Sequence, residues 1–358
     1  MFVLDSHCDT PSQILRLRDL STDDEHSHVD FPKLKRGKVD GAFFALYVPA
    51  SLDDRPDEGL IYASSLLDGV VKTVEANADK AAFAVSRSEA RLNKDNGLFS
   101  VFLGLENGSP LGCSFDRLKW FYDRGVRYVT LCHSLDNGIC DSCASESKRW
   151  GGLSPFGKEL VREMNQMGML IDVSHASDES FYDVLECSSR PVAATHSCCR
   201  ALADHPRNLT DEMIRALASA GGVIQINFYP VFLDLSFSEL MLSSCLCDRG
   251  ELVENKFIAN PHDDVCRGAW YDILDQLSSL RRPSFRRIAD HIDHVVELVG
   301  IDHVGLGSDF DGIAVTPSGM EDVSMMPVLF DELRLRGYSD CDLSKIASSN
   351  FFRVLESR

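Results

Sequence analysis

The chain has 358 residues, of which 44% are hydrophobic and 25% are charged, as in ordinary globular proteins. Its formal net charge of −19 repels phosphate backbones, so we expect no nucleic acid among its partners. No apolar run approaches the roughly 18 residues needed to cross a bilayer, which predicts that the protein has no membrane span.

The cysteines and the N-terminus bear on the compartment. Twelve cysteines lack a regular spacing, and Cys198 and Cys199 are adjacent, which favours reduced thiols over a disulfide framework. The strand-like start FVLDSHCD leaves no room for a signal peptide. We therefore expect a cytoplasmic protein, although a processed chain with an added Met would begin in the same way.

Short β-rich apolar runs alternate with amphipathic stretches, which is typical of βα units around a parallel sheet. The runs are apolar almost throughout, as expected for strands covered on both faces. Since eight parallel strands can close a barrel, the pattern predicts a (β/α)8 barrel. The eight runs lie at residues 2–5, 41–48, 99–106, 126–133, 169–175, 191–197, 222–228 and 303–309.

Two of the intervening stretches predict helices clearly. Residues 154–168 offer Ser154 as N-cap, Pro155 in the first turn and Gly168 as the stop. Residues 209–221 carry apolar side chains at helical spacing, which indicates a face packed on the core.

Residues 229–284 depart from this alternation. They follow the seventh run and mix apolar with charged residues, so we expect an insertion or a lid over the mouth of the barrel. No linker or internal repeat is visible, which predicts that residues 1–358 form a single barrel domain carrying this insertion.

Side chains that can bind metals recur at the carboxyl ends of the predicted strands, where active sites of barrels lie. His7 and Asp9 follow the first run, and because strand side chains alternate between faces, both can point the same way. The other members of the set end the third, fifth, sixth and eighth runs: Glu106, His175, His196 and Asp309.

Each of these residues also has a plainer interpretation. Glu106 could cap its loop, His175 and His196 could be buried hydrogen-bonding imidazoles, and Asp309 could be a turn residue before Asp311 and Gly312. Their convergence at the same end of five different strands favours a metal site, because independent accidents would not produce it.

Imidazole and carboxylate ligands suit zinc, and the ligand types leave manganese, cobalt and iron open. His7, Asp9, Glu106, His175 and His196 make five ligands, which is more than one four-coordinate catalytic zinc uses. Glu106 can bridge two ions through its two oxygens, which predicts a site with two Zn2+ ions. A hydroxide shared by the ions would then be the nucleophile, since metal binding makes it available near neutral pH.

Eight segments of the chain together form a recognisable set: DSHCDT, GLENG, LCHSLDNGICDS, GLSPFGKELVREMN, LIDVSH, ATHS, HPRNLTDEM and GIDHVGLGSDFDG. On these segments the chain resembles the membrane dipeptidase (renal dipeptidase) family over nearly its whole length. The resemblance implies a barrel of the amidohydrolase type with a binuclear zinc centre, and it also implies a homodimer.

The resemblance also implies how the metal ligands divide between the ions. His7 and Asp9 would bind one zinc, Glu106 would bridge, and His175 and His196 would bind the other.

Three further residues receive roles by resemblance. His133 would contact the substrate carbonyl and stabilise the oxyanion, with a structural His as the other interpretation. Arg207 would bind the terminal carboxylate of the substrate, which suits a planar guanidinium, unless it forms a surface salt bridge. Asp309 would take the proton of the attacking water and pass it to the leaving amine.

Three positions depart from the family pattern, namely Ser6, Cys8 and Asn107. None is a predicted ligand, so they put the shape of the loops in doubt more than the metals. Cys8 could add an extra ligand, but strand alternation should point it away.

The sequence thus predicts a zinc-dependent hydrolase of dipeptides with a free C-terminal carboxylate, including L,D-dipeptides. One alternative keeps the metals but makes the substrate a different small amide or a lactone. Another is a metal-dependent binding or structural protein, which the complete set of predicted ligands disfavours. His262, His291, His294 and His303 receive no role, and the last three are expected at the surface or in packing.

Overall fold

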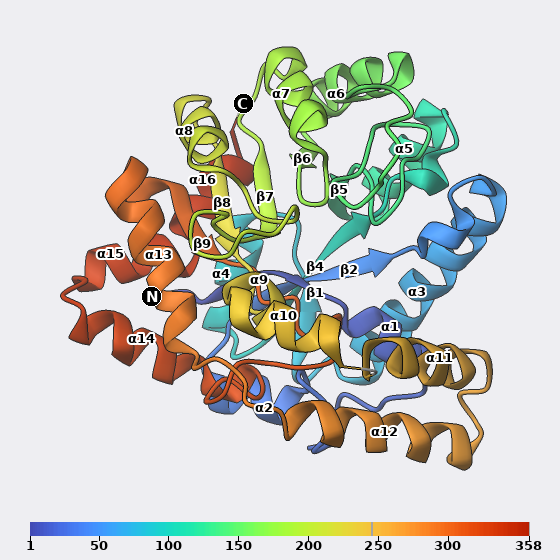
Figure 1. The fold of residues 1–358 in the computed structure, drawn as a ribbon, viewed down its shortest axis with the longest axis vertical. Coiled ribbons are helices and arrows are strands. Elements are labelled where there is room, and N and C mark those ends of the chain that lie inside the picture. Colours follow the sequence, from blue (N-terminus) through green and yellow to red (C-terminus); the bar gives the residue numbers. More distant parts are fainter. Residues whose placement is uncertain (245, 358) are drawn as a thin grey trace.

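A computed structural model describes residues 1–244 and 246–357, and a parallel β-barrel forms its centre (Figure 1). Within those residues eight strands pair in chain order, and all the pairs are parallel. They are β1 Leu4–Cys8, β2 Gly41–Tyr47, β4 Phe99–Glu106, β5 Val126–Thr130, β6 Leu170–Asp172, β7 Ala193–Ser197, β8 Val223–Ile226 and β9 Val304–Leu306.

The barrel closes just beyond the last residue of β9. Cys8 and Phe310 form a parallel bridge, and the Asp9 N–H donates to the Phe310 carbonyl at 2.8 Å. The Asp309 N–H donates in turn to the His7 carbonyl at 3.0 Å. The predicted (β/α)8 barrel is therefore confirmed. Seven of the eight predicted apolar runs contain a strand of the barrel, and the first run, at residues 2–5, overlaps only the start of β1.

One further strand was not predicted. β3 (Ala81–Phe83) pairs with residues 99–101 of β4, outside the barrel. The pairing of β4 with β5 begins only at Leu103, so the first residues of β4 have a free edge that β3 covers. A three-residue strand is too short to give a recognisable period.

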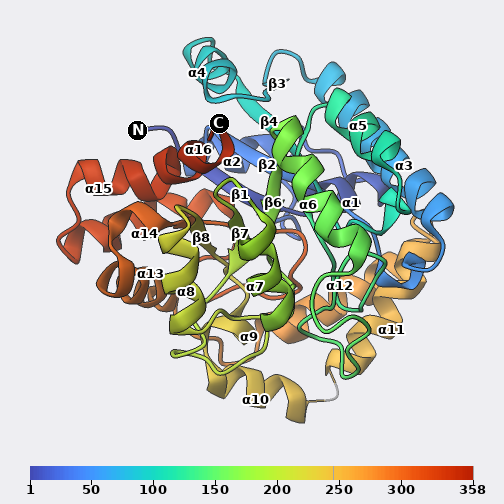
Figure 2. The same ribbon diagram turned by 90° about the horizontal axis from the view of Figure 1, so that it is seen from above.

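Helices surround the strands (Figure 2), and the two predicted most clearly are present. In α6 the Ser154 hydroxyl accepts from the Gly157 N–H at 2.9 Å, and Gly168 ends the helix at φ +76°. The outer helices are α1 Thr10–Leu15, α2 Phe31–Gly37, α3 Pro56–Ala76, α4 Arg87–Asp95, α5 Phe115–Asp123, α6 Pro155–Met167, α7 Asp178–Cys187, α8 Asp211–Ser219, α13 Arg286–Val299, α14 Met326–Leu335, α15 Asp340–Ser344 and α16 Asn350–Leu355.

Aromatic side chains fill one end of the barrel. Phe43 stacks on Phe102 and on Tyr128, with ring centroids 4.8 and 5.1 Å apart, and Phe351 of α16 packs edge-on against it. Gly104 makes room for this packing, because a Cβ there would lie 2.2 Å from Cζ of Tyr128. Because these aromatic side chains close one end of the barrel, the open end is the one where the strands have their carboxyl ends.

Residues 229–284 form four helices with an apolar cluster of their own. The helices are α9 Pro230–Leu233, α10 Leu235–Ser243, α11 Leu246–Ala259 and α12 Asp264–Ser278. The cluster includes Phe237, Phe257, Trp270 and Ile273. Figure 1 shows α9 and α10 in front of the strands, and Figure 2 shows α10 on the side opposite α4 and β3.

An ion pair ties this segment to the first βα connection. Arg16, next to α1, meets Glu254 of α11 with an Nη2 to Oε1 distance of 2.9 Å. Since α1 begins directly after Asp9, α11 packs on the side of the barrel where β1 ends. Among the described residues, no helix is both apolar and long enough to cross a membrane.

Candidate metal centre and active site

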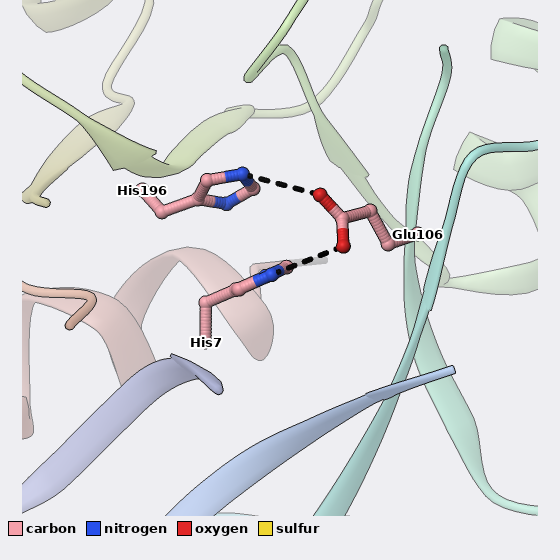
Figure 3. Close-up of side chains that lie close together, drawn as sticks. All are labelled: His7, Glu106 and His196. Atoms are coloured by element: carbon pink, nitrogen blue, oxygen red, sulfur yellow. Dashed lines mark ion pairs between the residues drawn. The ribbon is translucent and has the colours of Figure 1, made fainter. Parts of the chain in front are cut away.

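The five predicted metal ligands meet at the carboxyl end of the barrel, around Glu106. Figure 3 shows three of them, His7, Glu106 and His196. Its Oε2 lies 3.4 Å from Nε2 of His7, which lies 3.8 Å from Oδ2 of Asp9. Its Oε1 lies 3.1 Å from Nε2 of His175 and 3.4 Å from Nε2 of His196. The two oxygens of one carboxylate thus face different histidines, and the rings of His7 and His196 lie side by side with their centroids 3.7 Å apart.

Strand ends bring these side chains together. Glu106 is the last residue of β4, and His7 and His196 lie on β1 and β7, all pointing into the barrel end. His175 follows β6 by three residues and has a left-handed backbone, with φ +68°. Such a conformation is costly for a residue with a Cβ, and here it accompanies a side chain aimed at Glu106.

The residues present fit a bound metal. Nε2 of His7 and Oδ1 of Asp9 are buried and have no hydrogen-bond partner among the described residues. Nε2 of His175 and Nε2 of His196 lie 2.9 Å apart, so two imidazoles aim the same atom at one point. Buried, unpartnered nitrogen and oxygen donors at this spacing are what a divalent cation such as zinc would satisfy.

The pKa values of the three clustered histidines shift in different directions. Burial opposes protonation of His7, but the carboxylates of Glu106 and Asp9 outweigh it and raise the pKa of His7 well above its usual value. Burial, followed by the charge of Arg207, lowers the pKa of His175 well below its usual value. Burial, followed by His7, does the same to the pKa of His196. His175 and His196 are therefore neutral, the form that binds metals. At His7 the two carboxylates that favour a proton would equally favour a bound cation in its place.

His133 lies beside this cluster in the connection after β5. Its ring centroid is 4.3 Å from that of His175 and 4.8 Å from that of Tyr47, and its Nδ1 is buried without a partner. Burial, followed by the charge of Arg207, lowers the pKa of His133 to about 3. A neutral imidazole with a free nitrogen can donate a hydrogen bond to an oxygen placed at the centre.

Arg207 is buried in the loop after β7. Its guanidinium donates to the His196 carbonyl at 3.0 Å and to the Ser197 hydroxyl at 3.3 Å. The ring of Phe232 lies 5.4 Å away, and Nε has no partner among the described residues. The guanidinium is thus held in place while keeping a donor free, and no carboxylate of the described residues forms an ion pair with it. The predicted alternative of a surface salt bridge is wrong.

Asp309 follows β9 with a left-handed backbone, φ +63°, and its carboxylate lies within reach of His7 and Asp9. Its Oδ2 accepts a hydrogen bond from the Asn227 side chain at 2.9 Å. Burial, followed by the charge of Asp9, raises the pKa of Asp309 to about 6. A carboxylate that titrates near neutrality beside a metal cluster can both accept and return a proton.

Two residues that touch this cluster were not singled out from the sequence. Asn227 follows β8 and binds Asp309, and its place at the end of a predicted strand was a usable signal. The hydroxyl of Tyr128 lies 2.8 Å from Nδ1 of His7, but this residue sits inside an apolar run and gives no such signal. Both act on a predicted site residue through a hydrogen bond.

Cys8 and the unassigned histidines lie apart from the cluster. The thiol of Cys8 donates to the Phe43 carbonyl at 3.4 Å, so it faces β2. His291 is fully buried, and its ring bonds the Cys199 N–H and the Leu233 carbonyl. His294 pairs with Asp211, His303 contacts the Gly222 carbonyl, and His262 is exposed.

A family model described as membrane dipeptidase, peptidase family M19, matches residues 1–358. The chain belongs to this family. Dipeptidase verJ of Clonostachys rogersoniana is 31% identical over 339 residues, which cover 92% of this chain and 76% of that protein. The crystal structure of the probable dipeptidase PvdM from Pseudomonas aeruginosa has 28% identity and a TM-score of 0.83, covering 99% of this chain and 94% of that one.

A second solved structure shares the fold of this membrane dipeptidase family member. It is a metallopeptidase from Rhodobacter sphaeroides, liganded with a phosphinate mimic of the dipeptide L-Ala-D-Ala. The TM-score is 0.79 at 24% identity, and 99% of each chain is covered. The resemblance read from the sequence is confirmed, and the protein is a metallo-dipeptidase, a hydrolase that acts on the peptide bond of dipeptides.

Proposed function

We propose that this protein is a two-zinc dipeptidase whose metals are held by His7, Asp9, Glu106, His175 and His196. The observation that carries the proposal is the division around Glu106. One of its oxygens faces His7, and the other faces His175 and His196. A carboxylate shared in this way is suited to bridge two cations, with Asp9 completing the first group.

Two zinc ions bound here would supply a water that loses its proton near neutral pH and would polarise the carbonyl of the scissile bond. Residues of the chain do the rest. Arg207 orients the substrate by its terminal carboxylate, using the donors that point away from the His196 carbonyl. His133, neutral at pH 7, donates to the carbonyl oxygen as negative charge develops there.

Asp309 moves the proton in this scheme. Its carboxylate accepts the proton of the attacking water and returns it to the nitrogen of the leaving amine, while the Asn227 amide fixes its orientation. A pKa raised to about 6 by burial suits both halves of this transfer. The residue therefore starts and ends the cycle ionised.

The substrate class follows from the proposed binding of a terminal carboxylate by Arg207. An interior peptide bond offers no carboxylate to Arg207, so we expect dipeptides as substrates rather than proteins. The compound bound in the Rhodobacter sphaeroides structure mimics L-Ala-D-Ala, a dipeptide whose second residue is D, which supports L,D-dipeptides as candidate substrates. We further propose that residues 229–284 cover the mouth as a lid, because Phe232 of α9 lies 5.4 Å from the Arg207 guanidinium and Glu254 of α11 pairs with Arg16, next to α1.

The test combines metal analysis with a substrate panel. We expect about two zinc ions per chain and turnover of L,L- or L,D-dipeptides. Arg207→Ala should raise KM for dipeptides by about a hundredfold, the value of a charged hydrogen-bonded pair, and leave a neutral amide or lactone unaffected. Hydrolysis of neutral amides or lactones with no turnover of any dipeptide would instead support a different amidohydrolase activity.

A further inference from the structure

A chain of hydrogen bonds runs from His196 to a carboxylate on the neighbouring strand. Nδ1 of His196, the ring nitrogen that faces away from Glu106, lies 2.9 Å from the hydroxyl of Thr195. That hydroxyl donates to Oδ2 of Asp172 at 2.6 Å. All three side chains are buried.

The acceptor at the end determines the direction of this chain. Oδ2 of Asp172 accepts the Thr195 hydroxyl, so the Thr195 proton points to Asp172 and the Thr195 oxygen is left to accept from Nδ1–H of His196. With the proton on Nδ1, the lone pair of His196 lies on Nε2, which faces Glu106 and His175. This tautomer is the one that a metal ligand bound through Nε2 requires.

We infer that Thr195 and Asp172 are positioning residues that hold His196 in its metal-binding tautomer and orientation. The usual partner of a metal-bound histidine is a carboxylate or carbonyl in direct contact. Here the Thr195 hydroxyl stands between the imidazole and the carboxylate. The inference rests on the proposed role of His196 as a zinc ligand.

Asp172 is itself held rigidly enough for this role. Its Oδ1 accepts from the N–H of Ser174 at 3.0 Å and of Thr195 at 2.8 Å. Its Oδ2 accepts a second hydroxyl, that of Thr130 on β5, at 2.6 Å. The carboxylate therefore links β5, β6 and β7, and the strand that carries His196 cannot shift without breaking these bonds.

Thr130 provides a matched control. Thr130 and Thr195 donate to the same oxygen of Asp172 at the same distance, and both are buried, one on each of the two strands that flank β6. Of the two hydroxyls, the one on Thr195 contacts a histidine. Thr130→Val and Thr195→Val therefore remove equivalent bonds to Asp172, but only the second breaks the connection to His196.

The experiment measures metal affinity by competition with a chelator, the visible spectrum of the cobalt-loaded protein, and thermal unfolding. Thr195→Val should weaken one of the two metal sites by about 10- to 100-fold and change the cobalt spectrum. Thr195→Ser, which keeps the hydroxyl, should restore both. Thr130→Val should unfold at a similarly lowered temperature yet bind metal within about threefold of the wild type, since it leaves the His196 contact intact.

Two results would overturn the inference. Equal losses of metal affinity in Thr195→Val and Thr130→Val would mean that only the packing around Asp172 matters. Wild-type affinity in Thr195→Val would show that the hydroxyl does nothing for the metal. In both cases the wild type still binds two metals, whereas a wild type without metal affinity would refute the proposed function itself.

Discussion

The metal centre and the α9–α12 segment lie at the same end of the molecule but are built in different ways. Each ligand of the centre lies on or just after a strand whose register is set by its neighbours. The segment packs around its own apolar cluster and leaves Leu242, Leu252 and Val265 between 64% and 82% exposed. The metal ligands and the apolar cluster of α10–α12 thus depend on separate sets of contacts, while Phe232 of α9 lies beside Arg207. Mutations in α11 and α12 should therefore leave the metals in place.

The largest effect should come from Glu106→Gln. An amide cannot serve as a charged bridge, so metal content should fall and kcat/KM should drop by about ten-thousandfold, or about 5.5 kcal/mol. Elemental analysis and steady-state kinetics measure both. Glu254→Gln, an equivalent change in α11 at the ion pair with Arg16, should retain the metals. Loss of metal in both variants would contradict the conclusion that the metal ligands and α11 are supported by separate contacts.

Asp309→Asn should come next, with a loss of about a thousandfold in kcat/KM and no loss of metal. The pKa of Asp309 is raised to about 6, so the carboxylate is ionised at pH 7 and becomes protonated as the pH falls through 6. Bound cations favour the ionised form, which places the acid limb of the wild-type profile at or below pH 6. Steady-state kinetics measured from about pH 4.5 to about pH 8, on both sides of this pKa, test the acid limb. A variant that keeps the limb would assign it to another group.

Trp270→Ala addresses the segment itself. This side chain is 6% exposed in the apolar cluster, so truncation should cost about 3 kcal/mol of the free energy of unfolding. Hydrogen exchange in α12 should accelerate while the metal content is unchanged. Release of metal together with the faster exchange would show that the segment supports the centre after all.

The smallest effect is expected from Val265→Ser in the same helix. Val265 is 79% exposed, so the free energy of unfolding should change by less than about 0.5 kcal/mol. Thermal unfolding of Val265→Ser, measured alongside that of Trp270→Ala, compares the losses of stability in the two variants. A large loss of stability would mean that this surface is covered in solution.

Particular residues show how far the sequence could predict this protein. The barrel strands were recognisable because both of their faces are buried, which makes each run apolar. β3 was missed because it has three residues and covers only the edge of β4. Arg207 could be assigned a role only by resemblance, since nothing in its local sequence shows that it is buried beside His196.

The (β/α)8 barrel and the end of the barrel where its polar residues gather could be predicted from the chain, because strand period and burial are local properties. Which oxygen of Glu106 faces which histidine, and the link from His196 through Thr195 to Asp172, became visible only in the folded protein. These contacts join residues of different strands, so they depend on strand register and side-chain orientation around the closed barrel. No local pattern in the chain encodes them.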